Sequence, residues 1–201
     1  MTQRRERTAA QLRRREPRRE PYATVLVVCE GERTEVEYFM GLRRARQLSS
    51  ANIVVVGRGT DPVNVVRFAI EKAQSEGGWD HVYCVFDRDR HANFAQAIDE
   101  LRHAQIEGTQ FHAGVTNPCF EFWILLHFEY STRPYAGAGV RSPCDMVIGR
   151  LKQFLPDYQK NDADLFTKLE ALIPNAIQHA ELLVDHNRQT QSENPATCVH
   201  R

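Results

Sequence analysis

Short runs of β-branched and apolar residues alternate with helix-like segments along most of the chain, and this alternation is the strongest constraint on its fold. The runs occupy residues 24–29 (TVLVVC), 52–56 (NIVVV), 81–86 (HVYCVF) and, more weakly, 110–115. Continuous runs of this kind are typical of strands buried on both faces of a parallel sheet. Because helical segments separate them, we expect βαβ units and an α/β fold.

The segments between the runs carry helix signals. Thr34 and Glu37 have the spacing of a capping box, which predicts a helix over residues 34–47. Asp61 is a suitable N-cap, and Pro62 suits the first position of a helix that ends near residue 76. Further helices are expected from residue 94 to before Gly108, and over residues 119–128, 143–155, 162–173 and 175–189.

Right-handed crossovers restrict how four such strands can be ordered. The simplest solution is the order 2-1-3-4, with the first strand beside the third. We therefore predict a Rossmann-like, four-stranded and mainly parallel sheet between helices. The expected organisation is a basic flexible arm (1–21), an α/β core (22–130), a turn-rich flexible loop (131–142) and a helical C-terminal extension (143–201).

Composition excludes several classes of protein. A chain of 201 residues that is 42% hydrophobic fits one globular domain. It has no run of 18 apolar residues and no apolar stretch at its N-terminus, so we expect neither a membrane span nor a signal peptide. The five cysteines are odd in number and form no C-x-x-C pair, which argues against a disulfide framework or a zinc module and favours a reducing cytosol.

The net charge of zero conceals an asymmetry. Residues 1–20 contain eight arginines and three glutamates, a net charge of +5, and the rest of the chain therefore carries −5. A basic arm of this kind is either a solvated tail or a source of sequence-independent attraction to nucleic acid. On the second interpretation Arg13, Arg14 and Arg15 are candidate phosphate contacts.

Carboxylates follow two strands that the predicted order places side by side. Glu30 comes directly after the first apolar run, and Asp87 and Asp89 follow the third. Neighbouring strands lie about 4.8 Å apart, so these side chains are expected to converge at the carboxyl edge of the sheet. Crowded carboxylates without His or Cys favour Mg²⁺ or Mn²⁺, which serve phosphoryl chemistry. The alternative is that these acids are only solvated loop residues.

Four further residues are candidates for the same site. Glu121 lies in a nearly all-apolar segment, so its charge needs a metal, a cation or several donors, and a structural ion pair is the alternative. Glu35 is either a site acid or only favourable to the helix dipole. Glu32 is a secondary candidate, otherwise a solvated loop residue. Lys160 is either a surface lysine or a contact to a scissile phosphate.

Other routes to catalysis lack support in the sequence. Cys29 has no His–Asp relay beside it, which favours a packed strand residue over a nucleophile. Residues 57–60 (GRGT) lack the lysine of a P-loop, and no G-x-G-x-x-G occurs.

Taken together, an ordered set of motifs resembles the RloB-like family. They are residues 28–35 (VCEGERTE), 38–39 (YF), 60–62 (TDP), 85–89 (VFDRD), 117–123 (NPCFEFW), Tyr158 with Lys160, and 194–197 (NPAT). RloB-like proteins are in turn similar to the Toprim domains of topoisomerases, primases and OLD-type nucleases. The resemblance implies a Toprim-like fold in which Glu30, Asp87 and Asp89 are the metal-binding and catalytic acids.

The resemblance also carries functional expectations. Glu35 is the nearest match to a further acid of OLD-type nucleases, with a spacing one residue longer, and Glu121 fits the family's Asn-Pro-Cys-Phe-Glu block. The implied function is an Mg²⁺- or Mn²⁺-dependent nuclease that acts on DNA or RNA in phage defence or abortive infection. It implies a cytoplasmic bacterial or archaeal protein, with an ABC- or AAA-type ATPase partner and possible oligomers.

Two alternatives from other classes remain open. The first is a non-catalytic effector subunit that binds a partner ATPase or nucleic acid. The second is a D-x-D enzyme such as a haloacid-dehalogenase-like phosphatase or a glycosyltransferase. The phosphatase pattern places Thr or Val where Arg90 stands and has no Glu-Gly turn after the first strand.

Overall fold

The computed structural model describes residues 23–49, 53–88 and 92–201. It contains a five-stranded sheet in the order β2-β1-β3-β4-β5. The first four strands are parallel, and the last pairs antiparallel with its neighbour. The strands are β1 (Val25–Cys29), β2 (Ile53–Gly57), β3 (His81–Asp87), β4 (Gln110–Asn117) and β5 (Ala196–Thr197). The predicted α/β fold and the strand order 2-1-3-4 are thus confirmed.

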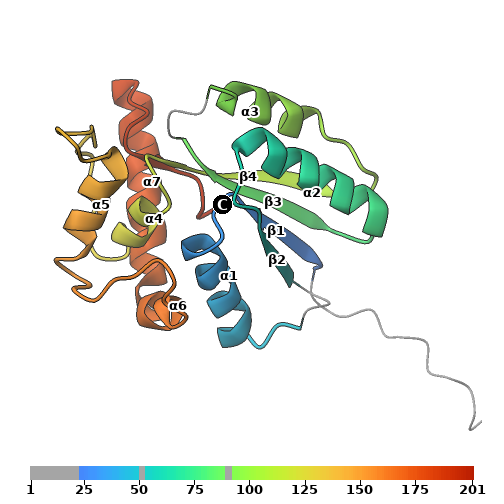
Figure 1. Ribbon diagram of the computed structural model, residues 1–201, viewed down its shortest axis with the longest axis horizontal. Coiled ribbons are helices and arrows are strands. Elements are labelled where there is room, and N and C mark those ends of the chain that lie inside the picture. Colours follow the sequence, from blue (N-terminus) through green and yellow to red (C-terminus); the bar gives the residue numbers. More distant parts are fainter. Residues whose placement is uncertain (1–22, 50–52, 89–91) are drawn as a thin grey trace, which may run out of the picture.

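Helices cover both faces of this sheet (Figure 1). One face carries α2 (Pro62–Glu76) and α3 (Phe94–His103), and α1 (Thr34–Ala45) lies on the other. A separate group of helices lies beside α1. It consists of α4 (Glu121–Leu125), α5 (Pro143–Leu151), α6 (Leu165–Leu169), a 3₁₀ turn (Glu170–Leu172) and α7 (Ile173–Thr190).

Alternate residues of β1 enter two separate hydrophobic cores. Leu26 and Val28 are fully buried among residues of α2, α3 and β3. Val27 and Cys29 face the opposite side and join the core that α1 shares with the C-terminal helices. This burial on both faces explains why the strand is a continuous apolar run rather than an alternating one.

A close contact joins α1 to the C-terminal helices. A Cβ atom on Gly41 would lie 2.4 Å from Cβ of Phe166, so only glycine allows α6 to approach α1 this closely. The buried ring of Phe166 meets Tyr38 edge-on at a centroid distance of 5.3 Å. This contact sets the position of the segment between α5 and α6, which contains Tyr158 and Lys160.

The C-terminal extension is not wholly helical, which corrects the sequence expectation. Residues Ala196 and Thr197 form β5, with Thr116 opposite Thr197 and Asn117 opposite Ala196. The strand satisfies backbone groups that the edge of β4 would otherwise expose. A two-residue strand is too short to produce a periodic pattern, so it cannot be predicted from the sequence.

Several helix limits also differ from expectation. The capping box at Thr34 is absent, because Arg33 is the N-cap and Thr34 lies inside α1 with its hydroxyl directed at Glu121. Only residues 121–125 of the expected 119–128 helix are α-helical, and the amides of His127 and Phe128 donate to carbonyls three residues back. The Asp61 cap is confirmed, since its side chain accepts the amide of Asn64 at 3.2 Å.

Two of the five cysteines are paired. Cys119, just before α4, forms a disulfide with Cys144 of α5. Cys29, Cys84 and Cys198 are free. The structure therefore contains one bridge between neighbouring helices, a pairing that the scattered sequence positions do not predict.

Three expectations about the chain's organisation have different outcomes. In the ranges that the structure describes, no helix is long and apolar enough to span a membrane. The basic arm lies outside the described residues. The flexibility of the 131–142 loop stays a prediction.

The contact between α1 and α6 generates a stability prediction. We expect Phe166→Ala to lower the free energy of unfolding by about 3–5 kcal/mol, because it leaves a cavity at a fully buried site. Urea unfolding followed by circular dichroism measures the change. Leu182→Ala on the exposed side of α7 is the control, with a change within about 0.5 kcal/mol. If both substitutions lower the free energy of unfolding equally, the packing of Phe166 against α1 is contradicted.

Candidate metal centre

Glu30 and Asp87 lie next to each other at the carboxyl edge of the sheet. Glu30 follows β1 directly, and its backbone N–H donates to the carbonyl of Val85 in β3 at 2.8 Å. Asp87 ends β3, and its backbone N–H donates to Oε2 of Glu30 at 3.0 Å. The predicted convergence of these two residues is therefore present. Asp89 lies outside the described residues.

Glycines allow the turn after β1 to pack against the end of β2. The backbone N–H of Gly59 donates to the carbonyl of Glu30 at 2.8 Å. Gly59 has a positive φ of 57°, and a Cβ atom there would lie 2.8 Å from the Glu32 carboxyl group. A Cβ atom on Gly57 would lie 2.9 Å from Cα of Glu32. Side chains at these positions would displace the turn that carries Glu30.

Glu35 is buried directly beneath the same turn. It is 8% exposed, and a Cβ atom on Gly31 would lie 2.4 Å from its Oε2. Burial raises the pKa of Glu35, and the charge of Glu121 raises it further, although backbone N–H groups and Lys160 oppose the shift. Glu35 is thus a carboxyl group that the fold holds close to other acids and away from water.

Glu121 is the most deeply buried acid of the site, with 2% exposure. Its Oε1 accepts hydrogen bonds from the hydroxyls of Tyr158 at 3.0 Å and Thr34 at 3.3 Å. The same oxygen lies 3.3 Å from Nζ of Lys160. The ion pair that was the alternative explanation for Glu121 is therefore present, and its cation is Lys160. Burial and the charge of Glu121 raise the pKa of Tyr158, which keeps its hydroxyl protonated as a donor.

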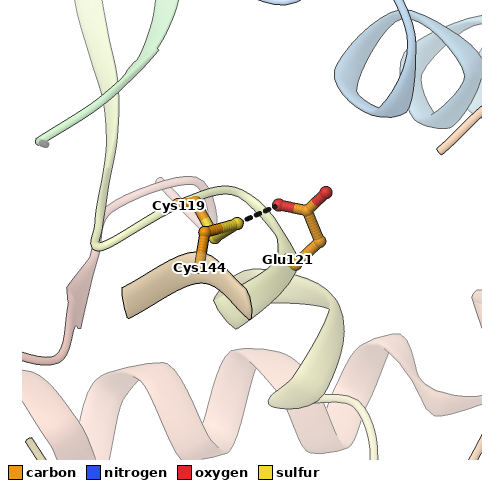
Figure 2. A group of neighbouring side chains, drawn as sticks. All are labelled: Cys119, Glu121 and Cys144. Atoms are coloured by element: carbon orange, nitrogen blue, oxygen red, sulfur yellow. Dashed lines mark hydrogen bonds between the residues drawn. A yellow bond between two sulfur atoms is a disulfide. The ribbon is translucent and has the colours of Figure 1, made fainter. Parts of the chain in front are cut away.

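The disulfide lies against the other oxygen of Glu121. Figure 2 shows Cys119 and Cys144 beside the carboxylate, with Sγ of Cys144 3.3 Å from Oε2. Among the described residues, these three form the cluster of potential metal-ligand side chains with donor atoms within 4.8 Å of one another. A disulfide sulfur has no proton to donate and is not a thiolate ligand. In the bridged form the contact is therefore steric.

The candidate acids surround one cleft of about 300 Å³. Its lining contains five carboxylates, two cations and small turn residues, namely Glu30, Gly31, Glu32, Arg33, Thr34, Glu35, Gly59, Asp87, Glu121 and Lys160. Every candidate acid in the described ranges lines this acidic cleft, and Lys160 lies there with them. Carboxylate oxygens are hard ligands, so this donor set fits Mg²⁺ or Mn²⁺ rather than zinc.

Sequence reasoning missed some of the residues that build the acidic cleft. The sequence pattern predicts a helix cap at Thr34 and carries no signal for Arg33. Tyr158 was only part of a motif, although it is a direct donor to Glu121. The sequence signal for these contacts is the Tyr-x-Lys spacing, because Tyr158 and Lys160 both reach Oε1 of Glu121. Arg13, Arg14 and Arg15 lie outside the described residues.

Burial of Glu35 generates a pH-dependent stability prediction. A raised pKa means that the folded protein binds the proton more tightly than the unfolded chain does, so stability is lost as pH rises through the folded pKa. We expect Glu35→Gln to remove this loss, so that the variant gains stability relative to the original protein as pH rises towards neutral. Thermal unfolding in EDTA across pH measures it. Glu71→Gln, on the exposed side of α2, is the control, and an equal gain in both variants would contradict the assignment.

The bond between Tyr158 and Glu121 generates a second prediction. We expect Tyr158→Phe to destabilise the protein by about 1–3 kcal/mol, because a buried carboxylate loses a donor. In a double-mutant cycle with Glu121→Gln, the coupling free energy should be about 0.5–3 kcal/mol. Tyr130→Phe, at a 42% exposed ring, is the matched control. Additive effects of the two substitutions would show that the hydroxyl does not act on Glu121.

Comparisons with known proteins identify a family for this chain. Neither the curated proteins nor the solved structures contain a match to this chain. A family model described as "RloB-like protein" matches residues 25–201, which include all strands and helices of the structure. The chain therefore belongs to the RloB-like family.

Proposed function

We propose that this protein is a Toprim-like nuclease that hydrolyses phosphodiester bonds with Mg²⁺ or Mn²⁺. The observation that supports the proposal most directly is the pairing of Glu30 with Asp87 on neighbouring parallel strands, in a cleft that also contains Glu35 and Glu121. Oxygen ligands at the carboxyl edge of an open α/β sheet are the expected place for such chemistry.

Several residues at the acidic cleft have a defined part in this proposal. Glu30, Asp87 and Asp89 would hold the metal, which when bound polarises the phosphate and activates a water molecule. Lys160, whose side chain is 53% exposed, would contact a phosphate oxygen. Glu121, Tyr158 and Thr34 act on Lys160 indirectly, because they fix the carboxylate that positions its ammonium group.

The biological setting is proposed from the family resemblance. The protein would act as an effector of phage defence, with an ABC- or AAA-type ATPase as partner and with nucleic acid as substrate. Arg13, Arg14 and Arg15 of the basic arm would add phosphate affinity, which weakens steeply as salt rises.

One observation favours a non-catalytic alternative. Glu121 has a cation and two hydroxyl donors within the fold, and Glu35 is buried beneath a turn. These two acids could therefore serve the structure of a subunit that only binds a partner ATPase or nucleic acid.

Cleavage assays separate the two functions. Purified protein is incubated with plasmid, single-stranded DNA and total tRNA in Mg²⁺, Mn²⁺ or EDTA. We expect the protein to cut in the presence of metal. Glu30→Gln and Asp87→Asn should each reduce the cutting rate by more than roughly 10–100-fold, which is the cost of losing a residue that only supports a metal ligand. Glu107→Gln and Asp185→Asn, two exposed acids far from the cleft in sequence, are the matched controls.

Two results would contradict the proposed nuclease activity. Cutting that persists in both site variants would locate the activity elsewhere or in a contaminant. If the protein neither cuts nor binds divalent metal by calorimetry, the non-catalytic alternative replaces it.

A further inference from the structure

A second cleft adjoins the acidic one and shares Asp87 and Lys160 with it. Its volume is about 770 Å³, more than twice that of the acidic cleft. The end of β4 forms one wall, and the other is formed by the loop between α4 and α5, from Tyr135 to Ser142, together with the first residues of α5. We call this space the strand cleft.

The strand cleft is richer in cations than its neighbour. Among the residues that the structure describes, its lining holds the cations Arg88, Arg141 and Lys160, and Asp87 at the shared border is the one carboxylate. Arg88 is held by Glu193, with Nη2 2.6 Å from Oε2. Arg141 is exposed and makes no ion pair within 4 Å in the described part of the chain. The cleft therefore presents cations to whatever occupies it, directly beside the acids.

The loop wall that carries Arg141 is held in place at both ends. At one end the side chain of Asn194 accepts the amide of Tyr135 at 3.1 Å and donates to its carbonyl at 2.8 Å. At the other end Ser142 caps α5. Between them the backbones of Ala138 and Arg141 pair as a small hairpin. The guanidinium group is therefore carried by a hairpin whose two ends are anchored to the fold.

The size of the strand cleft restricts what it can hold. Its volume lies within the range of about 300–1,000 Å³ that is typical of sites for single small ligands. A few nucleotides of one strand fit such a space. A B-form duplex is too wide for it, because its major groove alone is about 12 Å wide. A positive groove that follows one backbone is also the usual way in which proteins bind single strands.

We propose that the strand cleft binds an unpaired segment of DNA or RNA and leads it to the acidic cleft, so that the substrate is single-stranded at the site of cleavage. This inference rests on the proposed nuclease function and adds a substrate class to it. Arg141 contacts the phosphates of the bound strand, and Arg88, paired with Glu193, lines the same cleft as Asp87.

Binding measured without cleavage tests the inference. Fluorescence anisotropy in EDTA compares a labelled single strand of about ten nucleotides with the duplex of the same sequence. We expect the single strand to bind more tightly, and Arg141→Ala to weaken it several-fold. Arg141→Ala should also reduce the slope of log K against log salt by about 0.7, the value for one phosphate contact to a single strand.

Further variants keep the test specific. Val140→Glu places a negative charge at the fully exposed hairpin tip and should weaken single-strand binding as well. Arg102→Ala, at an exposed arginine of α3, removes the same charge elsewhere and should change neither affinity nor slope. Unchanged melting temperatures exclude unfolding as the cause.

The outcomes distinguish this inference from the proposed function. If the duplex binds as tightly as the single strand, or if Arg141→Ala and Arg102→Ala have equal effects, the strand cleft inference is wrong even where metal-dependent cutting is observed. If single strands bind through Arg141 but nothing is cut, the cleft inference stands as a binding site and the nuclease proposal fails.

Discussion

The buried carboxylate of Glu121 is the interaction on which the site depends. A buried carboxylate at 2% exposure is costly unless charge and donors compensate it, and here they come from two separate parts of the chain. Thr34 comes from the start of α1, whereas Tyr158 and Lys160 come from the segment between α5 and α6. The carboxylate can be satisfied only when the C-terminal helices are docked on the α/β core. Formation of the site is therefore coupled to folding of the whole chain.

Local packing around the acids shows the same coupling on a smaller scale. The turn after β1 closes over Glu35 only because Gly31 has no side chain, and it meets β2 only through Gly57 and Gly59. Glu35 gains a position close to Glu121 and loses contact with water, which is why the pKa of its carboxyl group rises. An acid held in this way does not improve the stability of the folded chain at neutral pH. Such an arrangement is expected where residues are placed for function rather than for stability.

The sequence was sufficient for the features that depend on local pattern. Four apolar runs and the handedness of crossovers gave the strand order, and that order placed Glu30 beside Asp87. It was insufficient where a contact joins distant segments. Tyr158 reaches Glu121 across 37 residues from a segment without regular structure, and β5 has only two residues. Neither produces a periodic signal. The capping-box prediction for Thr34 is wrong because its hydroxyl donates to the distant carboxylate of Glu121, whereas a capping box would need the hydroxyl oxygen to accept a backbone N–H of the same helix.

On the proposed function, the two adjoining clefts would serve phosphate chemistry in a chain of zero net charge. Carboxylates repel a nucleic acid backbone, so cations that attract the backbone are expected close beside them. Glu30 and Asp87 lie at the ends of β1 and β3, whereas Arg88 and Arg141 line the neighbouring strand cleft. Asp87 and Lys160 belong to both clefts, which makes their border the place where a phosphate would meet both charges. Because the loop wall is tied to Asn194 beside β5, the short strand that completes the sheet also supports this border.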